Sequence, residues 1–524
     1  MPVQVFRHAR IRTGVPGDPV ATAIATEAGR IVAVGDEADV HAEVGAGAEL
    51  VDLDGACVLP GMYDAHIHTE NLAESLTAVD LRGALDLDDA LRRVGTFAAE
   101  TTAGQWISGG RWDANRWAGR GRPSRLALDS LLGDRPAVLD SIDGHSAWVN
   151  SAALRIAGID TGTPDPVGGA YDRDENGEFT GIVRESAIAQ FRELAREASR
   201  ADLPEQLLGV QELLHSVGLT SIHDIDGEVV RAAYLGLRDQ GHLGLRVHKA
   251  IPVGALEVAI DEGRKTGDGD DWVTTGPVKL FGDGALGSHS CHLTEPFTGT
   301  ENHGMAVTSE QELLRLVSLA DAAGIAVATH AIGDRAAQSV LDAYEHVATR
   351  GSGLRHRIEH AQHLRPVDIR RMAALGVVAS MQPTHCTSDI ELVDTLLGDR
   401  DVASYAWRDV LNAGVPLAFG SDAPVEEPNP FHGLYAAATR ARADGSPAGG
   451  WQPEQRLGVG EAITAYTLGS AYAAGEEQHK GLLTPGRLAD FIVVDTDPLE
   501  ATPAQLRDTA VLTTVVGGVV RWQR

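Results

Sequence analysis

Short apolar runs that end in polar or glycine-rich residues recur through the middle of the chain, and each run is followed by a stretch with helical spacing. One such stretch, residues 309–324, has apolar residues at the 3.6-residue period and stops at a glycine. With about eight repeats, this alternation predicts a parallel sheet closed into a TIM-type (β/α)8 barrel rather than an open doubly wound sheet. The clearest runs are GLTSIHDID, GPVKLFGDGALG, GIAVATHAIGD, RHRIEHAQH, GVVASMQPTH and VPLAFGSDAP.

The two ends of the chain have a different, β-rich pattern. Residues 24–36 have the pattern of a hairpin, and residues 488–498 hold a further Val-rich run. Residues 511–522 hold two more such runs, separated by Gly517-Gly518. Neither end is large enough for a core of its own. We therefore expect residues 1–60 and 476–524 to form one small β-sandwich, with the barrel at 61–475. Residues from about 85 to 200 are too many for one βα unit and predict an insertion over the barrel mouth.

Charge and cysteine content limit the partners and the compartment. The 524 residues include 44 Lys+Arg and 74 Asp+Glu, a net charge of −30, which disfavours nucleic acid and anionic membrane surfaces. The three cysteines have neither disulfide nor metal spacing. No apolar run approaches the ~20 residues of a membrane span, and residues 1–16 lack a signal-peptide pattern. We expect a cytoplasmic protein that binds a small molecule.

Histidines and an aspartate stand where barrel strands are expected to end. His66 and His68 are two residues apart, so on a strand both imidazoles face the same side. His330, His360 and Asp422 each close a separate apolar run. Active sites of such barrels lie at the carboxyl ends of the strands, where these five side chains would converge. Imidazoles with a carboxylate predict a divalent-metal site, with zinc as the preferred ion.

Lys279 is one of only four lysines among the 44 basic residues, and it lies in the apolar run GPVKLFGDG. Beside metal ligands its pKa should fall, and a neutral amine can take up carbon dioxide to form a carbamate that bridges two metals. The alternative is an ordinary lysine paired with a carboxylate such as Asp283. The residues alone leave both readings open.

The chain resembles the amidohydrolase superfamily, within it the subgroup of N-substituted formamide deformylases and exoenzyme regulatory proteins. The matching motifs, in order, are LPGMYDAHIH, DGHSAWVNSAAL, VKLFGDGALGS, THAIGD, RIEHAQHL, GSDAPV and GLLTPGRLADFIVVD. The resemblance implies a metal-binding barrel with a β-sandwich, and a homodimer as a common assembly. It also implies two metal positions, one held by His66, His68, Lys279 and Asp422, the other by Lys279, His330 and His360.

The leading hypothesis is hydrolysis of a non-peptide C–N bond, of amide or N-formyl/N-acyl type, with one or two zinc ions per chain. Asp422 would act as general base toward a metal-activated water. His145 would be a second catalytic residue, donating a hydrogen bond in the substrate pocket to the carbonyl or oxyanion. Trp112 and Trp117 would contact the substrate, although aromatic packing between inserted loops explains them equally well.

Two alternatives stay open. The first is a deaminase with one metal at His66, His68, His330 and Asp422, in which Lys279 is unmodified and His360 bonds the hydroxide. The second is a non-catalytic regulatory protein, which should have lost ligands. None of the expected ligands is missing from the sequence.

Overall fold

Eight parallel strands form the centre of the molecule, and their order predicts where the candidate ligands meet. The computed structural model describes residues 3–45, 47–102, 104–117 and 121–524. Its eight-stranded sheet runs in the order β22-β20-β18-β17-β16-β15-β14-β7, with parallel neighbours throughout. The strands are β7 (Met62–Ile67), β14 (Leu219–Asp224), β15 (Arg246–Pro252), β16 (Val273–Phe281), β17 (Val327–Ala331), β18 (Arg357–His360), β20 (Val378–Met381) and β22 (Leu417–Phe419).

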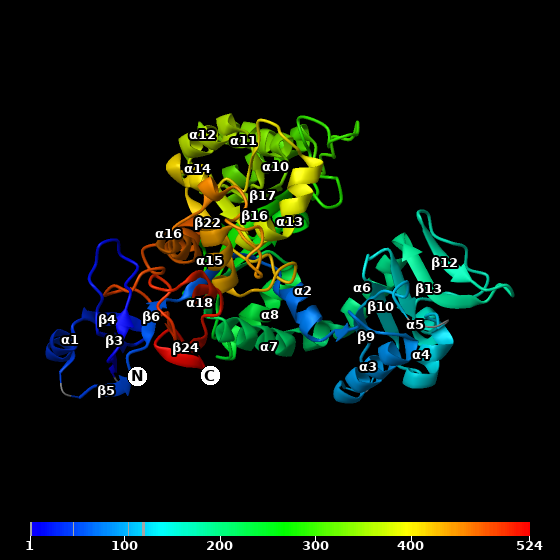
Figure 1. Ribbon diagram of the computed structural model, residues 1–524, viewed down its shortest axis with the longest axis horizontal. Coiled ribbons are helices and arrows are strands. Elements are labelled where there is room, and N and C mark those ends of the chain that lie inside the picture. The colour runs from blue at the N-terminus through cyan, green and yellow to red at the C-terminus, as the bar shows by residue number, and fades with distance from the viewer. Residues whose placement is uncertain (1–2, 46, 103, 118–120) are drawn as a thin grey trace. The chain divides into compact units, whose positions relative to one another are not determined.

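Helices alternate with these strands, as the apolar spacing predicts (Figure 1). The helix expected at 309–324 is α10, which begins where the Ser309 side chain accepts a hydrogen bond from the Glu312 amide. The other helices that alternate with barrel strands are α8 (Glu228–Asp239), α9 (Leu256–Asp261), α11 (Asp334–Ala348), α12 (Pro366–Leu375), α13 (Pro383–Leu396), α14 (Trp407–Asn412) and α15 (Pro430–Thr439); α10 spans Glu310–Ala322.

The first and last strands of this sheet, β7 and β22, contact each other, so the sheet is nearly closed. Just beyond them, the amide of Asp422 donates to the carbonyl of His66, and the amide of His68 donates to the carbonyl of Ala423. The predicted TIM-type barrel is therefore confirmed, and its seam lies among the candidate metal ligands.

Strands from both ends of the chain form the expected β-sandwich. One sheet has the order β4-β3-β1-β5 and the other β2-β6-β23-β24-β25. In the second sheet, β6 near the N-terminus pairs antiparallel with β23 near the C-terminus. Phe6 and Phe491 meet edge to face in the shared core, with ring centroids 4.9 Å apart. The strands are β1 (Gln4–Arg7), β2 (Arg10–Ile11), β3 (Ala23–Glu27), β4 (Arg30–Gly35), β5 (Glu49–Asp52), β6 (Cys57–Pro60), β23 (Phe491–Val494), β24 (Val511–Val516) and β25 (Val519–Gln523).

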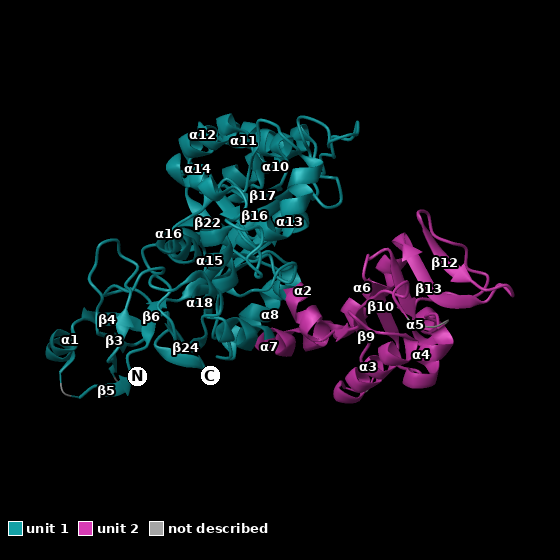
Figure 2. Ribbon diagram, in the orientation of Figure 1, with its two compact units in different colours: residues 1–69, 210–524 teal, residues 70–209 magenta. Residues whose placement is uncertain are grey.

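Residues 70–209 form a second compact unit, distinct from the unit of residues 1–69 and 210–524 (Figure 2). The insertion expected at about 85–200 falls within it. Its six-stranded sheet, β12-β13-β11-β10-β9-β8, has an apolar core on each face, because neighbours such as Val138 and Leu139 point to opposite sides. Its main elements are β8 (Val79–Asp80), β9 (Ile107–Trp112), β10 (Ala137–Ser141), β11 (Ser146–Val149), β12 (Gly169–Arg173), β13 (Phe179–Glu185), α3 (Leu87–Glu100), α4 (Arg125–Leu132) and α6 (Ser186–Ser199).

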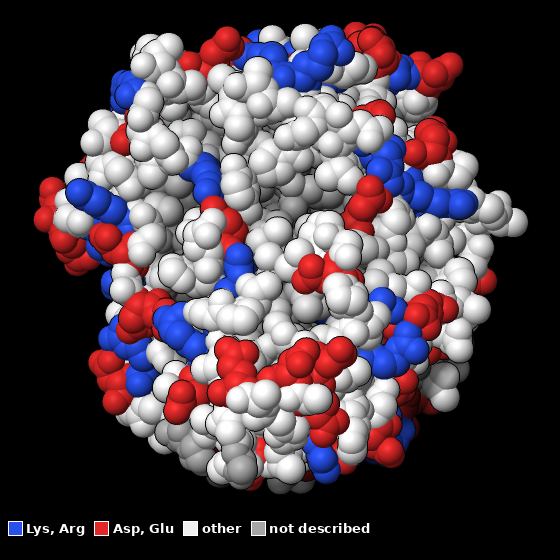
Figure 3. Space-filling model, turned by 90° about the vertical axis from the view of Figure 1, so that its left-hand side faces the viewer, with Lys and Arg blue, Asp and Glu red and all other residues white. Residues whose placement is uncertain are grey.

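Acidic and basic side chains are interspersed over the face drawn in Figure 3, where Lys and Arg atoms form no continuous area. Elsewhere on the surface, ion pairs such as Arg315–Glu312 and Arg371–Asp342 likewise set opposite charges side by side. Within the described residues, no helix combines the length and the apolar character that crossing a bilayer requires.

Candidate metal centre

The carboxyl ends of four barrel strands carry the five predicted side chains. His66 lies in β7 and His68 directly follows it, His330 lies in β17, His360 ends β18, and Asp422 comes three residues after β22. His360 and Asp422 have φ angles of 70° and 59°. Non-glycine residues adopt such left-handed conformations rarely, and they cluster at functional sites.

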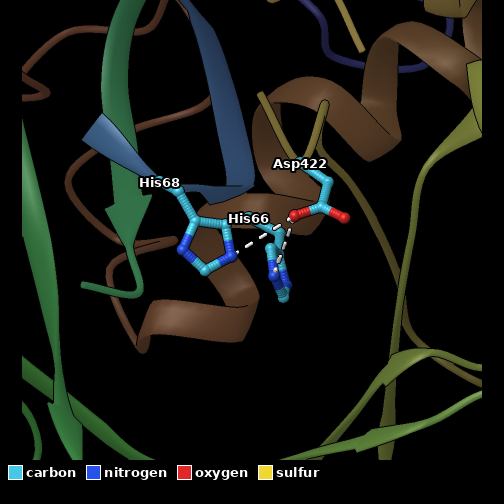
Figure 4. A group of neighbouring side chains, drawn as sticks. All are labelled: His66, His68 and Asp422. Carbon is cyan, nitrogen blue, oxygen red and sulfur yellow. Dashed lines mark ion pairs between the residues drawn. The ribbon is translucent and has the colours of Figure 1, made fainter. Parts of the chain in front are cut away.

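The Asp422 carboxylate lies against the two histidines of the first strand (Figure 4). Its Oδ1 atom is 3.5 Å from Nε2 of His66 and 3.4 Å from Nε2 of His68. His66 is fully buried, whereas the His68 side chain is 24% exposed. The three ligand atoms can therefore surround one ion that is reached from the His68 side.

The second oxygen of Asp422 faces a different histidine, His385 of α13. The Oδ2 atom of Asp422 is 3.7 Å from Nε2 of His385, and these two residues form a second candidate ligand group with His360. Ring contacts join the groups, because the His360 ring centroid is 4.9 Å from that of His66 and 4.5 Å from that of His330. The structure thus brings all four predicted histidines and Asp422 into one cluster.

One ring nitrogen of each predicted histidine is held by an oxygen that accepts a hydrogen bond. In the neutral ring the other nitrogen then has a lone pair, the state that a metal ligand needs. The pairs are His66 Nδ1 to Glu359 Oε2 at 2.6 Å, His68 Nδ1 to Asp226 Oδ1 at 2.7 Å, His360 Nδ1 to Gln382 Oε1 at 2.8 Å, and His330 Nε2 to the Gly284 carbonyl at 3.1 Å.

These donors fit a divalent cation. The Nε2 atom of His66 is buried and has no hydrogen-bond partner among the described residues. A buried polar atom without a partner costs about 1–3 kcal/mol, which binding of a cation to this atom would remove. Imidazole nitrogens with a carboxylate oxygen suit zinc and similar ions.

Burial and neighbouring charges set the protonation of the cluster. Burial, together with the charge of Lys279, lowers the pKa of His66 to about 4, and burial likewise lowers the pKa of His330 to about 4. Burial alone would raise the pKa of Asp422, but the contact with His68 and the nearby imidazoles hold it well below its usual range. Burial alone would lower the pKa of His68 as well, but its hydrogen bonds to Asp226 and Asp422 raise it to about 9. Neutral imidazoles and an ionised carboxylate are the forms that bind a cation, so a cation has to displace a proton from His68.

Lys279 lies buried in β16, and burial lowers the pKa of its ammonium to about 8. Asp283, the partner that the sequence offered, accepts three hydrogen bonds from the amides of Ile332, Gly333 and His292 instead. Among the described residues, Lys279 has no ion pair, and its Nζ atom lies 5.1 Å from the Phe281 ring centroid. The structure therefore contradicts the Lys279–Asp283 pair.

The remaining predicted residues belong to the second unit. His145 is exposed and holds Glu185, with Nδ1 3.1 Å from the carboxylate. Trp112 and Trp117 pack in one of the cores of that unit, with ring centroids 6.2 Å apart, and Trp112 donates its indole N–H to the Leu139 carbonyl. This is the packing role that the sequence left open for both tryptophans, and contact of these three residues with a substrate stays a prediction.

The site predicted from the sequence does not include His385, nor Glu359 and Asp226, whose carboxylates hold His66 and His68. His385 follows the apolar run GVVASM, like the predicted ligands, but Pro383 and Thr384 separate it from the strand and begin α13. Glu359 is the residue before the end of β18, and Asp226 lies two residues after the end of β14. A search for polar residues at strand ends could therefore have found both.

Known proteins resemble the chain over nearly its whole length. A sequence model of the Amidohydrolase family matches residues 49–521. Protein LONG AFTER FAR-RED 3 of Arabidopsis thaliana is 34% identical over 95% of this chain and 88% of its own length. N-substituted formamide deformylase of Arthrobacter pascens is 30% identical over 99% of this chain and 98% of its own. An uncharacterized metal-dependent hydrolase from Pyrococcus furiosus superimposes with a TM-score of 0.81 at 29% identity, covering 95% of this chain and all of that one.

Proposed function

This chain belongs to the amidohydrolase family and is a metal-dependent hydrolase, and on that premise we propose that it hydrolyses a non-peptide C–N bond in an amide of N-formyl or N-acyl type. The observation that carries the proposal is that the two oxygens of the Asp422 carboxylate face different histidines. One oxygen faces His66 and His68, and the other is turned away from them toward His385. A carboxylate held in this way can serve a cation with one oxygen and accept a proton with the other.

The steps follow from the positions of these side chains. Zinc or a similar divalent cation, when bound, supplies Lewis acidity toward water and toward the substrate carbonyl. Asp422 takes a proton from the attacking water on Oδ2, and a C–O bond forms at the carbonyl carbon. Asp422 then passes the same proton to the leaving nitrogen as the C–N bond breaks. The products are a carboxylic acid and an amine.

We include in this proposal a carbamate on Lys279. A lysine with a pKa near 8 has a substantial neutral fraction at physiological pH, and only the neutral amine reacts with carbon dioxide. The side chain is buried beside His66 and His330, on whose pKa values its charge acts. The carbamate would convert a cation that repels metals into an anion with two oxygens, one for each of two cations.

The proposed substrate class is based on the name of a relative that matches nearly the whole chain. N-substituted formamide deformylase of Arthrobacter pascens is a relative whose name describes removal of a formyl group from a substituted nitrogen. The same proton transfer through Asp422 would serve formyl and larger acyl groups. Within that class, the groups that line the pocket determine which amide is accepted.

Turnover of an amide panel tests the proposal. The protein, loaded with zinc, is assayed against N-formyl, N-acyl and cyclic amides, with release of the amine as the readout. We expect one of the N-formyl or N-acyl compounds to be hydrolysed, and His66→Ala to abolish that turnover together with bound metal. Release of ammonia from an aminated ring by a protein with one metal, without amide cleavage, would instead favour the deaminase.

A further inference from the structure

His385 lies beside Asp422 in the candidate site, yet the proposed function gives it no chemical role. It is the third residue of α13, a helix of 14 residues that starts right after Gln382, the residue that holds His360. The ring of His385 stacks on that of His360, with centroids 6.1 Å apart and planes inclined by 16°. The histidine therefore belongs to the wall of the site.

The side chain of His385 is 10% exposed, and its Nε2 atom has no hydrogen-bond partner among the described residues. The nearest charged oxygen is Oδ2 of Asp422 at 3.7 Å, too far for a direct hydrogen bond. Oδ2 is also the oxygen to which the water would give its proton. Nε2 thus points at the place where the reacting group of a substrate must lie.

The surroundings of the ring distinguish a hydrogen-bond donor from a metal ligand. His66, His68 and His360 each donate from Nδ1 to an oxygen, which leaves Nε2 free to bind a cation. Within residues 3–45, 47–102, 104–117 and 121–524, no acceptor is hydrogen-bonded to Nδ1 of His385. Because a carboxylate oxygen faces its Nε2 atom, that nitrogen is the favoured place for the ring proton.

We propose that His385 is a catalytic residue that donates a hydrogen bond from Nε2 to the acyl oxygen of the substrate, an inference that rests on the proposed amide hydrolysis. The acyl oxygen gains negative charge when water adds to the carbonyl carbon, and a positioned N–H stabilises that charge more than it stabilises the ground state. The donor thus comes from the same barrel end as Asp422.

Replacement by residues with and without a donor tests the role. His385→Leu removes the N–H and should lower kcat/KM about 10²–10³-fold, as loss of one such donor does elsewhere. His385→Gln keeps an amide N–H and should recover part of that loss. Metal content, measured by mass spectrometry, should equal that of the parent in both variants. If the leucine variant does not fold, His385→Met makes the same test.

A matched control separates the role from the mere loss of a buried imidazole. His215 of α7 (Leu203–Ser216) is 2% exposed, and among the described residues its ring bonds only the Gly244 carbonyl, at 3.2 Å. His215→Leu should lower the melting temperature without lowering kcat/KM per folded, metal-loaded molecule. A fall in bound metal in His385→Leu would overturn the proposal in favour of a ligand. Equal kcat/KM for His385→Leu and parent would overturn it as well.

Binding of methylphosphonate keeps the inference separate from the proposed function. Its oxygens imitate the charged tetrahedral carbon, and calorimetry reports affinity without turnover. The zinc-loaded His385→Leu variant should bind it about 10–100-fold more weakly than the parent, and His385→Gln should fall between. If the parent cleaves no amide yet this difference is found, the hydrolysis proposal fails and the donor role stands. Equal affinity in all three proteins would refute the donor role even if amides are cleaved.

Discussion

The backbone amide of Asp422 donates a hydrogen bond to the carbonyl oxygen of His66, with 2.7 Å between nitrogen and oxygen. This bond joins the first barrel strand to the loop after the last one. Because it fixes the two backbones against each other, the Asp422 side chain meets the His66 ring without depending on flexible side-chain contacts. Asp422 has a left-handed φ of 59° at this point, a conformation that residues other than glycine rarely adopt.

We expect Asp422→Asn to keep the fold but lose most of the activity. The amide side chain is nearly the same size, yet it cannot accept the proton of the attacking water, so kcat should fall roughly 10²–10⁴-fold. Steady-state kinetics and metal analysis on one preparation check this. Asp490→Asn is the control, because Asp490 pairs with Arg246 at 2.6 Å and accepts from the Gly517 amide, so its loss should reduce stability rather than rate. Activity of Asp422→Asn within twofold of the parent would exclude Asp422 as the base.

Glu359→Gln should weaken metal binding although Glu359 is not a proposed ligand. Glu359 accepts from His66 Nδ1 and is itself held by Arg357, whose Nε donates to Oε1 at 2.7 Å. The oxygen of the neutral amide is a weaker acceptor than the carboxylate, so it holds the His66 ring less firmly and makes Nε2 less basic, and metal affinity should fall about 10–100-fold.

Competition with a chelator measures that affinity for Glu359→Gln, for the parent and for a control. Glu461→Gln is the control, since Glu461 binds Arg408 elsewhere in the same unit. Parent-like affinity in Glu359→Gln would show that His66 keeps its orientation without the carboxylate.

The chemical state of Lys279 distinguishes a site with one metal from a site with two. With a carbamate, Lys279→Ala should lose both metals together, and acetate or bicarbonate with excess zinc should restore part of the activity. Lys279→Arg should not be restored, because a guanidinium stays charged and cannot take up carbon dioxide. Metal analysis and activity with and without added carboxylate check this. One metal retained in Lys279→Ala, with no response to carboxylate, would support the mononuclear site.

Glu476 should make stability depend on acidity. Burial alone would raise its pKa, but the charge of Lys480, the nearby His248, and hydrogen bonds from Lys480 and Tyr63 lower it to about 2. A carboxyl whose pKa is lowered by folding stabilises the protein above its unfolded value, near 4.5, and this contribution is lost as pH falls from there toward 2.

Glu476→Gln should therefore be less stable than the parent at pH 7, by up to about 3 kcal/mol, and the difference should shrink between pH 5 and 3. Melting temperatures across that range measure it. A difference that stays constant with pH would show that the loss comes from packing rather than from the charge.

The sequence predicted the barrel and the sandwich because both have strong local signals. Apolar runs with polar ends specify the barrel strands, and Gly517-Gly518, with φ angles of 61° and 72°, suits the tight turn between β24 and β25. The sheet of residues 70–209 was not predicted, because its strands lie in the region that was assigned only as an insertion. Short strands such as β11, with four residues, give little periodicity to detect.

For the site, the position of a residue at the end of a strand predicted which side chains come together. Contacts made by residues outside the strand ends could not be predicted in this way. His66, His330 and His360 lie at strand ends and are gathered in the structure as that rule predicts, although their binding of metal remains to be tested. The rule cannot identify His385, which lies on a helix, nor show that Asp283 is held by backbone amides. Such facts depend on how loops fold against each other, which no local pattern records.

Pairing of β6 with β23 also has a consequence for how the chain is made. The two strands are more than about 400 residues apart, and the ribosome adds roughly 5–20 residues per second. The N-terminal strands therefore wait on the order of tens of seconds for their partners, with an unpaired sheet edge exposed. A nascent chain that stalls before β23 would present this edge to chaperones and proteases, so truncated forms should be removed rather than accumulate.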